Sequence, residues 1–280
     1  MPEGDTIHKL ARFLDAELRG TVVAETRLHP ALGPSRGAAR IESVTCKGKN
    51  LYIHYDGGAA LRSHLGLYGA WHRYRPGEDW RKPRRQASIV LVTPVWHLVC
   101  FNAREVQWLE AGGFRHRDGL YRLGSDLITA PLDPGALLGR CRGRLAPGTQ
   151  LVDVLLDQRI AAGIGNVYKS EVLFLEGCSP VQTLSATGDA ALLALYRRAA
   201  ALLKANLGGG PRATRENHDG HGHLWVYGRG GLPCLRCGMP VARGLLGQRP
   251  RSTYWCEGCQ AVSSGRSSLQ GIPVRSPEIG

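Results

Sequence analysis

Four cysteines near the C-terminus constrain the fold of this chain more than any other feature. They form two C-x-x-C pairs, Cys234-Leu-Arg-Cys237 and Cys256-Glu-Gly-Cys259, separated by eighteen residues. Each pair brings two sulfur atoms to one side of a turn, and four thiolates at this spacing favour tetrahedral Zn²⁺. Because protein sulfurs fill all four positions, we predict one structural zinc ion held by a hairpin. Zinc hairpins bind both DNA and protein, so the quartet alone leaves the partner open.

The charge of the chain indicates a polyanionic partner. Its 280 residues carry a net charge of +13 and have a pI near 9.7, and strongly basic chains most often bind nucleic acid. Most of the basic residues are arginine, which suits phosphate contacts but is also what a GC-rich genome encodes. No apolar run is long enough to span a membrane, and the start lacks the pattern of a signal peptide. We therefore expect a cytoplasmic protein.

Hydrophobic periodicity divides the chain into a β-rich half and a helical half. Apolar residues at helical spacing predict a helix over 6–18, and short β-like runs separated by Gly, Pro and Asp follow over 22–109. Further helices are predicted over 151–157, 166–176 and 190–207, broken by glycines. A strand pair then carries the cysteines. These patterns predict an α+β fold.

The N-terminus offers a nucleophile. Initiator methionine is normally removed before a small second residue, which would leave Pro2 with a free secondary amine. An α-amino group has a reference pKa of about 7.7–8.0, so a neutral fraction exists near pH 7 and can attack a sugar aldehyde to form an iminium. Glu3 lies next to it and is suited to proton transfer. Two residues alone do not establish this chemistry.

A glycine-rich turn precedes one of the predicted helices. Gly163-Ile-Gly165-Asn166 permits close backbone approach, and a helix beginning near Asn166 would direct its positive end and free N–H groups at a phosphate. An ordinary turn between helices has the same composition, so this signal is weak when taken alone.

In combination these segments resemble the formamidopyrimidine-DNA glycosylase/endonuclease VIII family. The matches run in the family's order from residue 1 to about 260. They are Met1-Pro-Glu-Gly4, Lys47-Gly-Lys-Asn-Leu51, Ser63-His-Leu-Gly-Leu-Tyr-Gly69, Gly163-Ile-Gly-Asn-Val-Tyr-Lys-Ser-Glu171, Val226-Tyr-Gly-Arg229 and Arg251-Ser-Thr-Tyr-Trp-Cys256, besides the cysteines. The resemblance implies a bifunctional DNA glycosylase and abasic-site lyase of base-excision repair, which cuts the strand by β,δ-elimination.

The resemblance assigns catalytic roles to three residues. Pro2 attacks C1′ of the damaged nucleotide and forms a Schiff base, and Glu3 acts as general acid and base. Lys49 contacts a phosphate near the lesion and assists the chemistry. Lys47 is a rival for that role, although the alignment of the strand favours Lys49.

The resemblance also assigns DNA contacts. Asn166 and Arg251 match residues that grip the flanking phosphates, and Lys169 is expected to bind DNA as well. Leu67 and Tyr68 match the position of side chains that fill the gap left by a flipped base, where an apolar wedge is physically reasonable. Core packing is the alternative role for Leu67.

The implied architecture has five parts. It combines an N-terminal β-sandwich bearing an N-terminal helix with a helical helix–two-turn–helix domain and a zinc finger. The expected bounds are 1–115 for the catalytic β-sandwich, 116–148 for a linker, 149–224 for the helical DNA-binding domain, 225–260 for the zinc finger and 261–280 for a disordered tail. We expect a monomer, associated with the nucleoid, that acts on damaged double-stranded DNA.

Two features place the chain nearer the endonuclease VIII branch, which removes oxidised pyrimidines. The segment between Gly210 and Trp225 is too short for the long loop that purine-specific members fold over 8-oxoguanine. In addition, Asn102-Ala-Arg104-Glu105-Val106 lacks the Arg-Arg-Phe type of sequence that those members place opposite the lesion.

One departure from the family pattern leaves alternatives open. Members often carry a second acid where this chain has Thr6. Either base removal is slowed relative to strand cleavage, giving mainly an abasic-site lyase, or Asp5 substitutes for that acid. A non-catalytic, zinc-containing DNA-binding protein is a further alternative, which the joint retention of Pro2, Glu3 and Lys49 disfavours. We interpret His218, His221 and His223 as part of a solvated loop and not as a second metal site.

Overall fold

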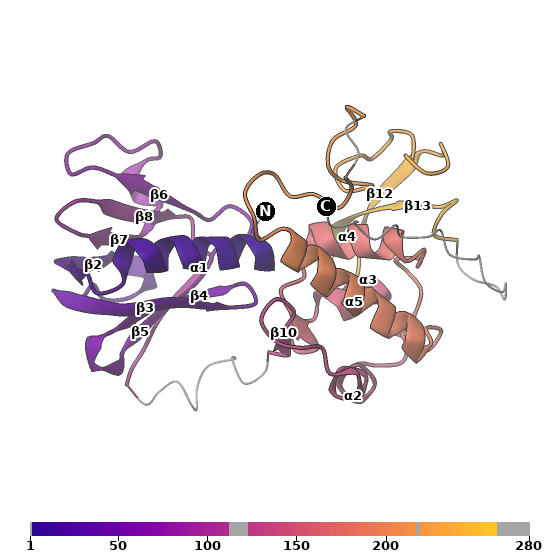
Figure 1. Ribbon diagram of the computed structural model, residues 1–280, viewed down its shortest axis with the longest axis horizontal. Coiled ribbons are helices and arrows are strands. Elements are labelled where there is room, and N and C mark those ends of the chain that lie inside the picture. The colour runs from indigo at the N-terminus through magenta and orange to yellow at the C-terminus, as the bar shows by residue number, and fades with distance from the viewer. Residues whose placement is uncertain (1, 112–122, 217–218, 262–280) are drawn as a thin grey trace, which may run out of the picture.

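A β-rich half and a helical half lie side by side along the long axis of the molecule (Figure 1). The computed structural model describes residues 2–111, 123–216 and 219–261. The N-terminal half holds two antiparallel sheets, and the C-terminal half holds helices and a strand hairpin. The predicted α+β class is thereby confirmed.

The N-terminal half is a sandwich of two sheets. One sheet has the strand order β1-β3-β4-β5-β9 and the other β2-β7-β8-β6. Short connections join three of the neighbouring pairs, β3–β4, β4–β5 and β7–β8, and such hairpins pair antiparallel. The strands are β1 (Val22–Val23), β2 (Glu25–Leu28), β3 (Ala39–Lys47), β4 (Asn50–Tyr55), β5 (Ala60–His64), β6 (Ala70–Tyr74), β7 (Ala87–Val92), β8 (His97–Phe101) and β9 (Glu105–Leu109).

Helix α1 (Gly4–Leu18) packs along the sandwich and closes its core. Its buried residues Ile7, Leu14 and Leu18 share one apolar cluster with residues from both sheets, such as Ile53 and Leu91. The helix therefore fixes the N-terminus of the chain at the end of the sandwich that faces the helical half (Figure 1).

The helical half has a separate core. It contains α2 (Pro134–Arg144), α3 (Leu151–Leu156), α4 (Asn166–Leu175) and α5 (Asp189–Ala205). Apolar faces of all four helices meet in one buried cluster. Among the described residues no helix is long and apolar enough to cross a membrane.

The predicted linker over 116–148 differs from the structure. Residues 116–122 lie outside the described part, but Pro134–Arg144 form helix α2. Asp133 caps this helix by accepting a hydrogen bond from the Ala136 N–H, and Leu137 and Cys141 are buried in the helical core. The abundance of Gly, Pro and Arg in this segment led to the prediction of a linker. The few apolar residues of α2 form a helix because tertiary packing against the helical core stabilises it.

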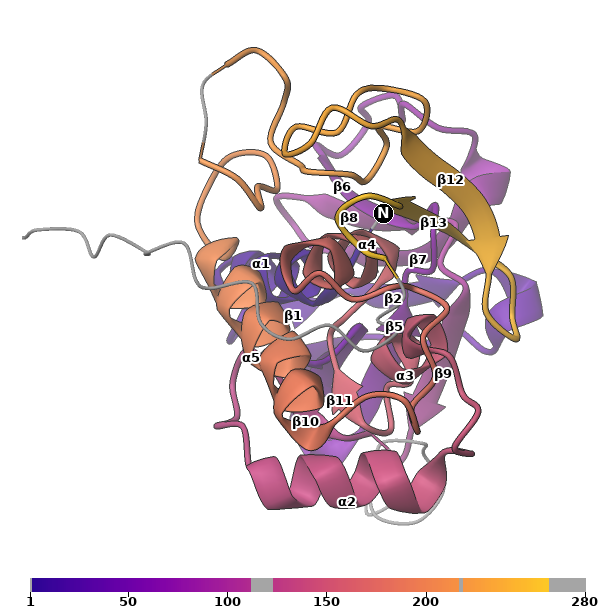
Figure 2. The same ribbon diagram turned by 90° about the vertical axis from the view of Figure 1, so that its right-hand side faces the viewer.

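The strand hairpin β12 (Val241–Leu246) and β13 (Arg251–Cys256) lies against α4, as the second view shows (Figure 2). The chain entering the hairpin is fixed by a buried carboxylate on α4. Glu171 accepts hydrogen bonds from the backbone N–H groups of Trp225, Val226 and Tyr227 at 2.8, 2.9 and 2.8 Å. Hairpin and helical core thus form one unit.

Two of the hydrogen bonds between the halves are donated by backbone N–H groups of glycine. The short parallel strands β10 (Ser125–Asp126) and β11 (Ala161–Ala162) lie next to the β3–β4 turn, where the Gly48 N–H donates to Asp126 at 2.6 Å. The Gly4 N–H at the start of α1 donates to the Gly163 carbonyl at 2.9 Å. The start of α1 and the β3–β4 turn are therefore held against the short β10–β11 sheet and the residue that follows it.

Gly48 is required at this junction for two independent reasons. Its φ is 57°, which side chains rarely adopt, and a Cβ there would lie 2.8 Å from the Ala162 Cβ. Gly57 in the next turn has a φ of 81° but open space around it. Comparing alanine substitutions at Gly48 and Gly57 therefore distinguishes the free energy lost to backbone strain from that lost to a clash between the halves.

We predict that Gly48→Ala lowers the free energy of unfolding by roughly 2–4 kcal/mol, since strain and overpacking add. Gly57→Ala should cost only about 1–2 kcal/mol, from strain alone. Urea unfolding monitored by tryptophan fluorescence compares the two variants. Equal losses would contradict a close contact between Gly48 and Ala162.

Candidate active site between the two halves

A cavity of about 630 Å³ opens where the two halves meet. The N-terminal half contributes the largest share of its wall, and α3, the turn before α4 and β13 close the other side. Its lining residues are Pro2, Lys49, His64, Leu65, Gly66, Leu67, Tyr68, Asn102, Arg104, Leu156, Gly165, Asn166 and Arg251. Six of the eight predicted catalytic and DNA-binding residues are among them.

Glu3 lies directly behind the cavity wall and is fully buried. Its carboxylate accepts hydrogen bonds from the Gly165 N–H at 2.8 Å, the Val167 N–H at 2.8 Å and the Tyr168 N–H at 3.3 Å. These groups surround the N-terminus of α4, where partial positive charge favours an anion. The sequence predicted that they would face a phosphate, but here a carboxylate of the protein itself occupies them.

Gly165 makes this contact sterically feasible. A Cβ at that position would lie 2.4 Å from the Glu3 carboxyl carbon, so the residue at this turn must be glycine. The glycine of the Gly-Ile-Gly-Asn motif is thus explained by the approach of a side chain from the other half of the molecule.

Burial raises the pKa of Glu3 above its ordinary value, while the nearby cations Arg212 and Lys49 and the backbone N–H donors oppose that rise. A carboxyl in such a setting retains more of its protonated form near neutral pH than a solvated glutamate does. It can therefore both donate and accept a proton.

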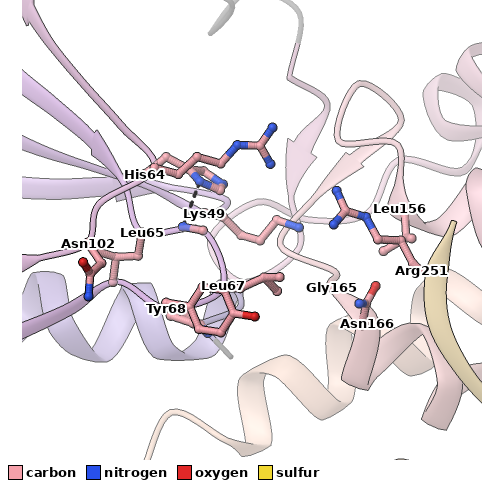
Figure 3. Close-up of a pocket in the computed structure, with 13 residues that line it drawn as sticks. Lys49, His64, Leu65, Leu67, Tyr68, Asn102, Leu156, Gly165, Asn166 and Arg251 are labelled. Atoms are coloured by element: carbon pink, nitrogen blue, oxygen red, sulfur yellow. Dashed lines mark hydrogen bonds between the residues drawn. The ribbon is translucent and has the colours of Figure 1, made fainter. Parts of the chain in front are cut away.

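Lys49 bridges the cavity from the β3–β4 turn. Its Nζ donates to the Ile164 carbonyl at 2.9 Å, and burial lowers the pKa of Lys49, which Glu3 partly offsets. Figure 3 shows its side chain extending toward Arg251 and Asn166 on the far side. Lys47 does not line the cavity, so the structure favours Lys49 over its rival on position.

Four of the residues expected to contact DNA line the cavity or its rim. Asn166 begins α4 and Arg251 begins β13, so both sit at element ends facing the opening (Figure 3). Leu67 and Tyr68 are 45% and 79% exposed, which excludes core packing for Leu67. Exposed apolar side chains at the mouth of a basic cavity suit a base or sugar as the contacting partner.

The prediction that Lys169 contacts DNA is wrong for this structure. Its side chain is fully buried, and its Nζ donates to the Thr253 Oγ1 at 2.8 Å and to the Ser252 carbonyl at 3.1 Å. Burial also lowers the pKa of Lys169 to about 8. Lys169 therefore links α4 to β13 directly beside Arg251. Its position in a motif typical of DNA binding did not indicate this packing role.

Three polar residues support the site without any signal in the sequence. Gln158 donates to the Ile164 carbonyl and accepts from the Gly163 N–H, both at 3.0 Å, which shapes the turn before α4. Asp126 holds the turn bearing Lys49, and Arg212 lies beside Glu3. Asp126 and Arg212 act through partners far away in the chain, so spacing along the sequence could not identify them. Gln158 contacts residues five and six positions further on, within the same turn.

The four cysteines of the predicted zinc site come together at the base of the hairpin. Their sulfur atoms all lie within 4.8 Å of one another, and the Cys237–Cys256 and Cys234–Cys259 pairs are 3.3 and 3.9 Å apart. Four thiolates around tetrahedral zinc are roughly 3.8 Å apart, because each Zn–S bond is about 2.3 Å. The donor set and its spacing fit a structural zinc ion.

Within residues 2–111, 123–216 and 219–261 this quartet is the one cluster of three or more metal-ligating side chains. His221 and His223 are exposed in their loop, and His218 lies outside the described residues.

Two family models match separate parts of the chain. The formamidopyrimidine-DNA glycosylase N-terminal domain matches residues 1–107, and the formamidopyrimidine-DNA glycosylase H2TH domain matches residues 140–216. The first match covers the sandwich and the second the helices on the other side of the cavity.

Curated relatives match along nearly the whole chain. A "Probable endonuclease 8 2" of Streptomyces coelicolor is 37% identical over 95% of this chain and 96% of its own length. A "DNA-(apurinic or apyrimidinic site) lyase Nei2" of Mycolicibacterium smegmatis is 33% identical over 94% of this chain and all of its own.

Solved structures agree. The MutM (Fpg) protein of Thermus thermophilus is 27% identical, with a TM-score of 0.76 over 94% of this chain and all of that one. The Lactococcus lactis formamidopyrimidine DNA glycosylase, solved with DNA containing an abasic site, shares the fold at 19% identity and a TM-score of 0.78 over 93% of this chain and all of that one. The chain therefore belongs to the formamidopyrimidine-DNA glycosylase and endonuclease 8 family.

Proposed function

We propose that this protein is a bifunctional DNA glycosylase and abasic-site lyase of base-excision repair that favours oxidised pyrimidines. The observation that carries the proposal is the meeting of Pro2, Glu3 and Lys49 at one cavity formed by both halves of the molecule. The names of the curated relatives, endonuclease 8 and abasic-site lyase, support the same chemistry.

The reaction begins at the secondary amine of Pro2, which is free once Met1 has been removed. The neutral amine attacks C1′ of the damaged nucleotide, the bond from C1′ to the base breaks, and the base leaves with a proton. Opening of the sugar ring then gives an iminium between Pro2 and C1′. The iminium withdraws electrons, so a proton can leave C2′ while the 3′-phosphate departs, and a second elimination releases the 5′-phosphate.

Glu3 supplies the proton transfers in this scheme. Its raised pKa makes both the protonated and the ionised form accessible. Its hydrogen bonds to backbone N–H groups hold the carboxylate in one orientation next to Pro2, so it is already in place when DNA binds. Lys49 carries a positive charge across the cavity, where it can neutralise the phosphate nearest the lesion.

The remaining lining residues suit DNA. Asn166 and Arg251 hold phosphates on either side of the lesion, and the exposed Leu67 and Tyr68 fill the gap left when the nucleotide leaves the stack. The net charge of +13 supports electrostatic capture of double-stranded DNA by a single chain. We infer a monomer that works at the nucleoid.

A second candidate is an enzyme that acts mainly on abasic sites. It is favoured by Thr6, a hydroxyl where an acid is common in the family, and by Asp5, whose two carboxylate oxygens are both engaged by Arg212. Comparing excision of thymine glycol with cleavage of a preformed abasic site separates the two candidates.

Zinc has a structural part in the proposal. Cys234, Cys237, Cys256 and Cys259 would hold one ion, which would fix the hairpin that presents Arg251. The ion supplies folding free energy and takes no part in the bond-breaking steps.

We predict that Pro2→Gly, Glu3→Gln and Lys49→Met each lower single-turnover cleavage of abasic-site DNA, by roughly 10²–10⁴-fold for the proton-transfer residue Glu3. DNA affinity should survive in Pro2→Gly and Glu3→Gln, because neither side chain is expected to bind phosphate. Lys47→Met is the matched control, since Lys47 does not line the cavity, and it should cleave normally. Cleavage at the native rate by Glu3→Gln would contradict the proposal.

We also predict one zinc ion per chain, measurable by elemental analysis. Cys237→Ser should lose the ion and lower DNA affinity by at least about tenfold, because the hairpin that carries Arg251 then loses its folding constraint. Cys178→Ser, a cysteine outside the quartet, should keep both. Native affinity in zinc-free protein would show that the hairpin is held by packing alone.

A further inference from the structure

We propose that Arg212, paired with Asp5, is a positioning residue that sets both the place and the ionic state of the Glu3 carboxylate. Arg212 lies in the segment that follows α5, whereas Asp5 and Glu3 lie at the start of the chain. The inference rests on the proposed role of Glu3 in proton transfer.

The guanidinium is fixed by two residues of α1. Arg212 Nε and Nη2 donate to the two carboxylate oxygens of Asp5 at 3.0 and 2.6 Å, and Nη2 also donates to the Thr6 Oγ1 at 2.9 Å. A bidentate ion pair of this kind fixes the orientation of the guanidinium as well as its distance from the carboxylate. The remaining nitrogen, Nη1, then lies 3.8 Å from Glu3 Oε1.

Tyr168 on α4 holds the guanidinium from another side. The Arg212 carbon Cζ lies 5.0 Å from the centre of the Tyr168 ring, a favourable cation–π distance. The N–H of Tyr168 is also one of the three donors to Glu3. Helix α4 therefore contacts both the carboxylate and its cation.

Burial makes this pair electrostatically effective. The Arg212 side chain is 15% exposed, and those of Asp5 and Glu3 are 1% and 0% exposed. Solvent screens such charges weakly, so the charge that Arg212 presents to Glu3 depends on how far Asp5 neutralises it. Asp5 thereby moderates the attraction between Arg212 and Glu3.

The same geometry accounts for Thr6. Both Asp5 oxygens are already occupied, and the Thr6 hydroxyl accepts one further N–H without adding charge. A carboxylate at position 6 would compete with Asp5 for Arg212 and add a third buried negative charge. Thr6 therefore fits this arginine-centred arrangement, and Asp5 serves as the partner of Arg212 and not as a substitute proton donor.

The other charged or titratable groups around Glu3 are few and come from four elements. They are the Pro2 amine in the same segment, Lys49 on the β3–β4 turn, Tyr168 and Lys169 on α4, and Tyr227 before the hairpin. Tyr168 is the group among these that touches the pair, through its ring contact with Arg212 and its hydroxyl near Asp5. Variants of Arg212 and Asp5 leave the other charged side chains around Glu3 unchanged in the sequence.

The test is a carboxyl titration that does not depend on catalysis. In full-length protein labelled with ¹³C-glutamate, the Glu3 signal is assigned by its loss in Glu3→Gln. Arg212→Gln should move the Glu3 midpoint up by about one pH unit or more, because an opposing cation has been removed. Asp5→Asn should move it down, because Arg212 then acts on Glu3 without compensation.

The opposite directions distinguish this proposal from a purely structural role. Arg212→Lys keeps the charge and should leave the midpoint near the native value. Arg215→Gln is the matched control, since Arg215 is a buried arginine of the same segment that pairs with Asp219 away from α1, and it should not move the midpoint. Where Arg212→Gln does not fold, Asp5→Asn carries the test alone.

Unchanged midpoints in both variants, or shifts in the same direction, would overturn the proposal. In parallel, the Glu3-dependent limb of the pH profile for single-turnover abasic-site cleavage should move in the same directions as the NMR midpoints. A protein that titrates as predicted but cuts no DNA would instead refute the proposed function and leave the electrostatic arrangement standing.

Discussion

The site depends on one interaction, the capture of the Glu3 carboxylate by the backbone N–H groups at the start of α4. Glu3 belongs to the β-rich half and α4 to the helical half, so the two halves must be docked before the carboxylate is in place. The glycine at position 165 leaves room for it, and the bond between the Gly4 N–H and the Gly163 carbonyl fixes the neighbouring backbone. The residue that we propose as general acid and base therefore also forms a contact between the two halves.

Around this carboxylate the charges are arranged in layers. Lys49 faces the cavity, where a phosphate would arrive, and Arg212 lies on the protein side, held by Asp5. Lys49, which we propose to interact with DNA, donates to a backbone carbonyl, whereas Arg212, which we propose to hold its place, is bonded to a buried carboxylate. Lys169 is also held in place, by the Thr253 hydroxyl and the Ser252 carbonyl, and it joins α4 to β13 beside Arg251.

The sequence predicted most of what depends on local pattern. The helices over 166–175 and 189–205, the antiparallel strands and the cysteine quartet follow from periodicity and spacing. The placement of Pro2, Glu3 and Lys49 at one cavity required the family resemblance, because they are far apart in the chain or too few to form a pattern. The sequence could not predict helix α2, the burial of Lys169 or the Arg212–Asp5 pair, since each depends on contacts between distant segments.

The most direct test of this account is to locate the covalent bond to DNA. Protein verified to begin at Pro2 would be mixed with a duplex containing an abasic site, reduced with borohydride, digested and sequenced by mass spectrometry. We predict that the sugar remnant is found on the peptide that begins with Pro2, because Pro2 lines the cavity. A remnant on Lys49 or another lysine, or no adduct at all, would contradict the central claim.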